Sequence, residues 1–305
     1  MVSEKKRFNG VKEDRVSVWD SHVHCYPREV ISDPVDWARK YGEHHWEQLV
    51  TSGPQGWADP EELLAAMDRD GIEKVLLQGW YWENRDTAHR QNEWHAKWIE
   101  QFPDRLLACM AIHPDMEDLE ITLKAGEAWG AVAVGECLPQ IQSKAGWQNP
   151  GWAKILNWTS GRGWPLTLHV TEPVGHEYPG RVETCLMETI QVIKDYPEQK
   201  WILAHWGGGL PFYSMNKRIR KALDRVWFDT AASPLLYDER VWKSLCGIIG
   251  PERILFGSDF PLLVYPSAQG SPGWQLLLEE LHGCGLSRTE VESIASKNLA
   301  RLLEH

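Results

Sequence analysis

The sequence predicts a (β/α)8 TIM barrel that forms a single domain over residues 1–305, with the barrel proper at about 16–304. Two observations predict it. Eight short β-rich runs recur, several of them almost continuously apolar, which is typical of strands buried on both faces of a parallel sheet. Helical patterns lie between the runs, and an eightfold alternation of strand and helix indicates this fold. The runs are 16–22, 74–79, 106–112, 131–136, 165–170, 201–205, 226–229 and 254–257.

Length and composition agree with one large domain. The chain has 305 residues, of which 43% are hydrophobic and 25% charged, so it can bury a sizeable core. Its net charge of −11 argues against a nucleic-acid partner, which selects a basic surface. A mean hydropathy of −0.42 and the lack of an apolar run of membrane length argue against a membrane partner. The unusual feature is 18 tryptophans, against 6 Phe and 8 Tyr.

Local signals predict two helix starts and one insertion. Asp59 precedes Pro60 and an acidic first turn, the pattern of a capped helix that Gly71 would end. Ser287 and Glu290 have the spacing of a capping box for the last helix. Residues 25–57 have no clear periodicity, so we expect an elaborated loop after the first strand.

The cysteines and the N-terminus bear on the cellular compartment. Six cysteines are scattered along the chain without a CxxC pair. The charged first eighteen residues are not followed by the apolar core of a signal peptide. We therefore expect a cytoplasmic protein with free thiols.

Histidines end three of the predicted strands. His22 and His24 lie two residues apart on the first strand, so their side chains share one face. His169 ends the fifth strand and His205 the sixth. All parallel strands of a barrel end on the same face, where barrel enzymes build their sites. We therefore expect these imidazoles to converge.

Two carboxylates follow the same rule. Glu136 ends the fourth strand and Asp259 the eighth. Burying so many ionisable groups without a counter-charge is costly. Imidazoles with a carboxylate suit a divalent cation, and zinc is the first choice, with manganese or iron as alternatives.

The chain resembles a known family in motifs that follow the barrel order. It is similar to the "amidohydrolase 2" branch of the amidohydrolase superfamily, which includes the aminocarboxymuconate-semialdehyde decarboxylase group. The resemblance covers about residues 16–304. The motifs are D-S-H-V-H at 20–24, H-W-G-G at 205–208, F-G-S-D-F-P at 256–261 and S-K-N-L-A-R-L-L at 296–303.

The resemblance implies a set of metal ligands. Members with two metals place a bridging carboxylate or modified lysine at the end of the fourth strand, whereas the decarboxylase group uses one metal. One or two ions are therefore expected. Two roles are open for Glu136, which are to bind an ion or to orient a metal ligand. The implied ligands are His22, His24, His169 and Asp259, with His205 as a ligand or as a catalytic group beside the metal.

The expected function is metal-dependent hydrolysis of a C–N or C–O bond in a small molecule, such as an amide, a cyclic amide or a lactone. The metal would lower the pKa of bound water from about 15.7 toward 7. Asp259 would take the proton and return it to the leaving group, while His205 would polarise the substrate carbonyl. The alternative is non-oxidative decarboxylation on the same site. A non-catalytic binding barrel is a third interpretation, which the complete ligand set disfavours.

Side chains beside the strand ends are candidates for binding the substrate. Aromatic residues at a barrel mouth can form an apolar wall, although each tryptophan can instead pack in the helix layer. The segment after the fifth strand is rich in polar groups for a connector. The candidates are Trp80, Trp82, Glu172, His176, Tyr178 and Trp206. Because barrels that resemble the amidohydrolases often dimerise, a homodimer is also expected.

Overall fold

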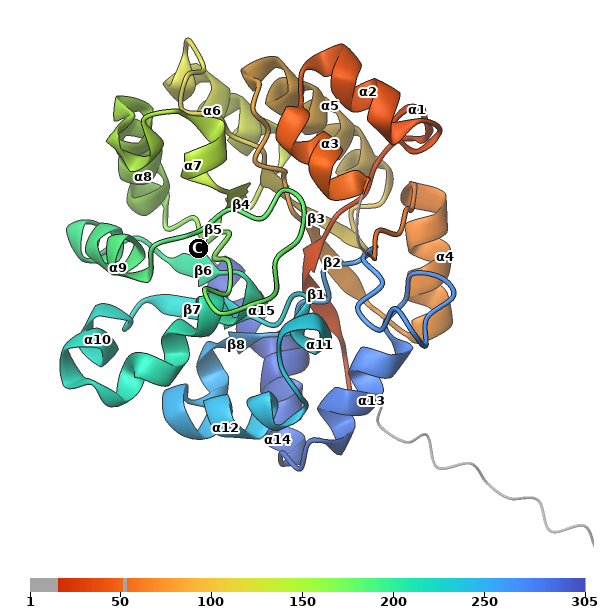
Figure 1. The fold of residues 1–305 in the computed structure, drawn as a ribbon, viewed down its shortest axis with the longest axis vertical. Helices are drawn as coiled ribbons and strands as arrows, with labels where there is room; N and C mark the ends of the chain where they lie inside the picture. The colour runs from red at the N-terminus through yellow and green to blue at the C-terminus, as the bar shows by residue number, and fades with distance from the viewer. Residues whose placement is uncertain (1–15, 52–53, 305) are drawn as a thin grey trace, which may run out of the picture.

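The computed structural model describes residues 16–51 and 54–304 and confirms the barrel (Figure 1). Of the predicted domain, residues 1–15, 52–53 and 305 lie outside the described part. Eight parallel strands pair in chain order. They are β1 (Trp19–Val23), β2 (Lys74–Leu77), β3 (Leu106–Met110), β4 (Ala133–Cys137), β5 (Leu166–Leu168), β6 (Trp201–Leu203), β7 (Val226–Asp229) and β8 (Ile254–Leu255).

The first and last strands approach each other and bring the sheet round into a ring. The backbone N–H of Ser21 donates to the carbonyl of Phe256 at 2.8 Å. Val23 forms a parallel bridge with Phe260, just beyond β8. Residues that follow β1 and β8 therefore lie side by side, although more than 230 positions separate them in the sequence.

Helices surround the strands as an outer layer (Figure 1). They include α4 (Pro60–Asp70), α5 (Arg85–Gln101), α6 (Leu119–Trp129), α8 (Pro150–Arg162), α9 (Leu186–Asp195), α10 (Lys217–Ala222), α12 (Arg240–Ile249) and α13 (Gln275–Gly283). Further helical segments between the strands are α7 (Pro139–Gln142), η1 (Gly146–Gln148), η2 (His205–Met215), α11 (Ser233–Leu236) and η3 (Pro251–Arg253). The chain ends with α14 (Arg288–Glu292), η4 (Ser293–Lys297) and α15 (Asn298–Leu303).

Both predicted helix starts are confirmed. The Asp59 carboxylate accepts the backbone N–H of Glu62, and the Glu62 carboxylate accepts that of Asp59. Gly71 ends α4 in the left-handed conformation, at φ 78°. Ser287 and Glu290 form the same reciprocal box at α14. The last helix departs from regular α-helix, because η4 is a π-helical turn between α14 and α15.

The elaborated insertion after β1 is confirmed, and it contains three short helices that the sequence did not predict. Asp33 caps the second of these helices, and Gly42 ends it at φ 72°. Helices of four to eight residues are too short to show a reliable apolar period, which explains why they were not predicted. In Figure 1 they lie together at one side of the ring, next to α5. They are α1 (Arg28–Ile31), α2 (Pro34–Tyr41) and α3 (His44–Val50).

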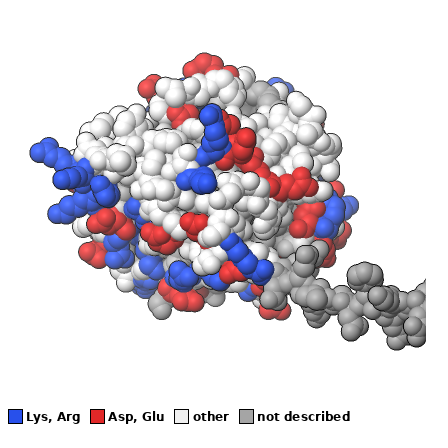
Figure 2. Space-filling view, turned by 90° about the horizontal axis from the view of Figure 1, so that it is seen from below, with Lys and Arg blue, Asp and Glu red and all other residues white. Residues whose placement is uncertain are grey.

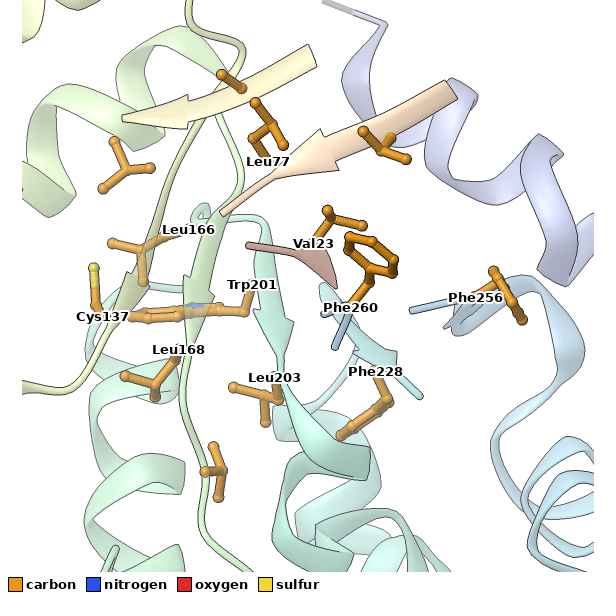
Figure 3. Close-up of a cluster of buried hydrophobic side chains, with 14 of the residues drawn as sticks. Val23, Leu77, Cys137, Leu166, Leu168, Trp201, Leu203, Phe228, Phe256 and Phe260 are labelled. Carbon is orange, nitrogen blue, oxygen red and sulfur yellow. The ribbon is translucent and has the colours of Figure 1, made fainter. Parts of the chain in front are cut away.

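Two apolar clusters hold the barrel together. The larger one joins strand residues to the helix layer, and Figure 3 shows part of it, including Leu166, Leu168, Trp201 and Leu203. The smaller one takes a residue from each of five strands and adds two from α15: Leu76, Cys109, Ala133, Ile202, Leu255, Leu299 and Leu302. Because Lys200 Nζ, just before β6, donates to the Leu302 carbonyl at 2.9 Å, α15 lies at the N-terminal ends of the strands. The opposite face of the barrel stays free for a site.

The remaining features of the fold are its helix lengths, its surface charges and its cysteines. Within residues 16–51 and 54–304, no helix has the length and apolar character needed to cross a membrane. Figure 2 shows acidic and basic side chains interspersed on one face of the molecule. All six cysteines are free thiols, as predicted, and Cys25, Cys109, Cys137 and Cys246 are buried.

Candidate active site

The structure brings the predicted metal-binding residues together at the C-terminal ends of the strands. His22 lies within β1 and Glu136 within β4. The others stand just beyond their strands, which is where side chains of a barrel reach its open face. They are His24 after β1, His169 after β5, His205 after β6 and Asp259 after β8.

His22, His24 and Asp259 form one compact group of donor atoms. The Nε2 atoms of His22 and His24 are 3.2 Å apart. Asp259 Oδ1 lies 3.8 Å from the first and 3.6 Å from the second. Ligands at about 2.1 Å from a tetrahedral ion are about 3.4 Å from one another, so these spacings match a coordination shell.

Glu136 lies between this group and the other two histidines. Its Oε2 is 3.5 Å from His22 Nε2 and 3.8 Å from His24 Nε2. Its Oε1 is 2.8 Å from His169 Nδ1 and 3.4 Å from His205 Nε2. His22, Glu136 and His205 thereby form a second group that can hold an ion. His169 adjoins this second group, because its Nδ1 lies 2.8 Å from Glu136 Oε1 and 3.1 Å from His205 Nε2, whereas its Nε2 faces the hydroxyl of Thr171.

Asp229, at the end of β7, orients the imidazole of His22 and holds the backbone of His205. Its Oδ2 accepts from His22 Nδ1 at 2.8 Å, and its Oδ1 accepts the backbone N–H of His205 at 3.0 Å. The Nδ1 of His205 donates to the carbonyl of Ala231 at 3.1 Å. In a neutral imidazole these bonds leave the Nε2 lone pairs of His22 and His205 directed at the donor cluster.

Asp20 fixes the turn that carries Asp259. Its carboxylate accepts the backbone N–H groups of His22 and Ser258, the Ser258 hydroxyl and the Trp274 indole N–H. Burial raises the pKa of Asp20 to about 6, although these hydrogen bonds lower it in part. The strand β1, the turn after β8 and the start of α13 are thus held by one side chain.

For His24, His169 and Glu136, the pKa shifts favour the forms that bind metals. Burial, with the nearby charge of His22, lowers the pKa of His24 to about 4. Burial also lowers the pKa of His169, despite Glu136. Burial opposes ionisation of Glu136, but the histidine charges outweigh it and hold the pKa of its carboxyl well below the usual range. Neutral imidazoles and an ionised carboxylate are the forms that bind metals.

His22 shows why this cluster fits a cation. Burial opposes its positive form, but the charges of Asp229 and Glu136 outweigh burial and raise its pKa well above the ordinary value. Its Nε2 faces another imidazole nitrogen and two carboxylate oxygens, and these oxygens are acceptors. A positive charge, either a proton or a metal ion, is needed between them. The donor set therefore fits a divalent ion.

The backbone at the cluster is unusual. His205, Trp206 and Asp259 have φ values of 57°, 54° and 68°, in the left-handed region that residues other than glycine rarely adopt. Such conformations cost about 1–3 kcal/mol each and concentrate at functional sites. Here they turn the chain sharply after β6 and β8, so that His205 and Asp259 meet above the barrel.

A cavity of about 220 Å³ opens onto the cluster. Its floor includes His24, Glu136, His169, His205 and Asp259. Most of its wall is apolar or aromatic, contributed by the insertion, by the segment after β2 and by the turns after β7 and β8. These wall residues include Tyr26, Leu49, Trp80, Tyr81, Leu235, Leu236 and Leu262. The space is comparable to cavities that take a substituted benzene ring.

Four of the six predicted substrate-binding residues line this cavity: Trp80, Glu172, His176 and Tyr178. Trp82 and Trp206 do not. Trp82 is buried against Trp37 and donates to Gln91, and Trp206 is buried against Trp242. Both side chains therefore pack in the helix layer, which was the alternative expectation for each tryptophan.

Several residues that line the cavity were not predicted from the sequence. Tyr81 stacks on Trp80 with ring centroids 4.4 Å apart, and both face the cavity. Strand alternation would have placed Trp80 and Trp82 together, but β2 ends at Leu77, so the alternation no longer applies. Tyr26 and Arg181 also line the cavity, and no motif pointed to them.

The fold and the cluster define a TIM-barrel enzyme with a divalent-metal site. Comparison with known families is more specific. The chain belongs to the amidohydrolase family, whose sequence model matches residues 19–304. The resemblance found in the sequence motifs is thereby confirmed.

Several of the similar proteins are decarboxylases. A 6-methylsalicylic acid decarboxylase from Penicillium expansum is 29% identical over 142 residues, which is 37% of this chain and 42% of the relative. The match thus spans less than half the length of that protein. A manganese-bound 5-carboxyvanillate decarboxylase from Novosphingobium aromaticivorans superposes with a TM-score of 0.72 at 16% identity, covering 96% of this chain and 97% of its own.

A 2,6-dihydroxybenzoate decarboxylase from Rhizobium gives a TM-score of 0.65 at 18% identity, covering 95% of this chain and 99% of its own. At such low identity these superpositions show a shared fold.

Proposed function

We propose that this protein is a metal-dependent, non-oxidative decarboxylase of a small aromatic carboxylic acid. The observation that carries the proposal is the cavity, in which Tyr26, Trp80 and Tyr81 surround a space that opens onto Asp259 and the donor cluster. A flat aromatic ring suits such a wall. The decarboxylase names of the relatives support this choice over hydrolysis, which was the first expectation from the sequence.

The reaction needs no oxidant. The bond between the ring carbon and the carboxylate breaks, CO2 leaves, and the electron pair that remains on the ring carbon takes up a proton. We propose that Asp259 carries this proton, because it lines the cavity and its side chain is 15% exposed, against 2% for Glu136. Water can then return a proton to Asp259 through its exposed edge.

The other residues bind and orient. When bound, a divalent ion supplies positive charge that holds an anionic substrate group beside two carboxylates. His22 and His24 would hold this ion together with Asp259 or Glu136. Trp80 and Tyr81 would restrict the ring to one plane. Zinc was the metal expected from the sequence, whereas manganese is bound in three similar structures, so both metals should be tried.

The proposal is tested with purified protein loaded with Mn²⁺ or Zn²⁺. Candidate acids are 2,6-dihydroxybenzoate, 5-carboxyvanillate and 6-methylsalicylate, and the readouts are CO2 and the ring product. We expect equal amounts of both, and their loss in Asp259→Asn but not in Glu177→Gln, whose side chain is 84% exposed on the loop after β5. Cleavage of lactones or amides without any CO2 release would refute the proposal.

A hydrolase remains the second candidate because of one observation. Glu136 lies within 3.8 Å of nitrogens from all four histidines, which is where a carboxylate bridging two ions would stand. Metal analysis separates the two. One ion per chain supports the decarboxylase, whereas two ions with activity on an amide or lactone support the hydrolase.

The remaining sequence predictions stand as proposals. We propose that the partner of the cavity is a small molecule and that the chain forms a homodimer in the cytoplasm. Light scattering of the purified protein at several concentrations tests the dimer, and cell fractionation tests the location.

A further inference from the structure

Glu172 places a carboxylate in the cavity wall without a cationic partner. The residue is 8% exposed and follows β5 by four positions. Its Oε2 accepts the hydroxyl of Tyr237, and its Oε1 accepts the backbone N–H of Val174 at 3.3 Å. Among the described residues none forms an ion pair with it. The nearby Arg181 instead bonds the backbone carbonyl of Glu172, at 3.0 Å, and pairs with Glu177.

The surrounding backbone is shaped around this side chain. Gly208 and Gly209 follow β6 with φ values of 57° and 76°. A Cβ at Gly208 would lie 2.7 Å from the carbonyl oxygen of Thr171, and one at Gly209 would lie 3.1 Å from Glu172 Oε2. The glycine turn therefore passes directly against Thr171 and Glu172 because it has no side chains there. The Glu172 carboxylate is thus fixed by Tyr237, which follows α11, by Val174 in its own loop and by the glycine turn packed against it.

The carboxylate has unused hydrogen-bonding capacity. An ionised carboxylate offers about four lone-pair positions, and two of these are used here. A buried charged group with few partners is unfavourable unless a further donor reaches it. The side from which a donor can reach Glu172 is the cavity that it lines.

We propose that Glu172 is a specificity-determining residue that accepts a hydrogen bond from a hydroxyl or amino group on the ring of the substrate. The substrate class is then an aromatic acid that carries such a donor in addition to its carboxylate. The inference rests on the proposed function in one respect, the choice of an aromatic acid. A methoxy group in place of the hydroxyl cannot donate, so the site should discriminate against it.

The test measures binding, so it does not depend on turnover. Calorimetry on the Mn²⁺-loaded protein compares 3- and 4-hydroxybenzoate with the matching methoxybenzoates and with benzoate. We expect at least one hydroxy acid to bind about tenfold or more tightly than its methoxy partner, since hydrogen bonds to charged groups are worth about that factor or more. In Glu172→Gln, which keeps the shape, this preference should fall below about threefold.

Two control variants complete the experiment. Glu177→Gln removes an exposed carboxylate from the same loop and should keep the full preference. Tyr237→Phe keeps the Glu172 carboxylate and should also prefer the hydroxy acid. Equal binding of hydroxy and methoxy acids by the wild type, or an unchanged preference in Glu172→Gln, would overturn the inference. Absence of CO2 release with the preference intact would instead count against the proposed reaction alone.

Discussion

Glu43 links the inserted helices to the barrel, and its burial should make stability depend on pH. It directly precedes α3 and is 1% exposed. Its carboxylate accepts the backbone N–H groups of Glu83 at 2.8 Å and Asn84 at 3.3 Å, in the segment between β2 and α5. Burial raises the pKa of Glu43 from 4.5 to about 7, although these bonds lower it in part.

The size and sign of the effect follow from that shift. Because the folded-state pKa is raised, the protonated form of Glu43 is favoured on folding. The stabilisation is complete below pH 4.5 and is lost as pH rises through about 7. A difference of roughly 2.5 pKa units corresponds to about 3 kcal/mol in the free energy of unfolding, most of it lost between pH 5 and pH 8.

Urea unfolding of the wild type and of Glu43→Gln at pH 5 and pH 8 measures this effect. Glutamine keeps an acceptor for the backbone N–H groups but does not titrate, so the wild type should lose about 2–3 kcal/mol relative to the variant over this range. The surface variant Glu61→Gln, whose side chain is 84% exposed, serves as the control. Parallel pH dependences for wild type and Glu43→Gln would show that the reasoning is wrong.

Three further predictions concern other parts of the fold. Gly208→Ala should lower the free energy of unfolding by about 1–3 kcal/mol in urea titrations, because the residue has φ 57° and its Cβ would meet the carbonyl of Thr171; unchanged stability would contradict this. Asp20→Asn turns an acceptor of the Trp274 indole N–H into a donor, so the melting temperature should fall, whereas an equal or higher value would show that the network is dispensable. In native protein, a thiol reagent should modify Cys185 first, since its side chain is exposed whereas Cys25, Cys109, Cys137 and Cys246 are buried; rapid modification of these buried thiols would contradict their packing.

Sequence reasoning could predict the donor cluster because barrel geometry fixes where strands end. His22 lies on the first strand and His24 directly after it, two residues apart and so on one face, and His169, His205 and Asp259 each stand where an apolar run stops. All parallel strands point the same way, so residues at their C-terminal ends meet on one face. The fold and the cluster thus follow from local patterns repeated along the chain.

The cavity wall follows from contacts that no local pattern reveals. Tyr237 reaches Glu172 across 65 positions. Trp82 packs against Trp37 in the helix layer. Because β2 ends at Leu77, the alternation of side chains along a strand does not determine where Trp82 points. The helices α1 to α3 are each too short to show a period. Side chains outside regular elements are placed by tertiary packing, which a single sequence does not display.

The most direct test of the proposed function follows the carboxyl carbon of the substrate. Mn²⁺-loaded protein is incubated in D2O with 2,6-dihydroxybenzoate labelled with ¹³C at the carboxylate, and NMR monitors both products. The account predicts labelled CO2 or bicarbonate and one deuterium on the vacated ring carbon, with neither formed by Asp259→Asn. If no tested aromatic acid loses its label while an amide or lactone is cleaved, the protein is a hydrolase and the account is wrong.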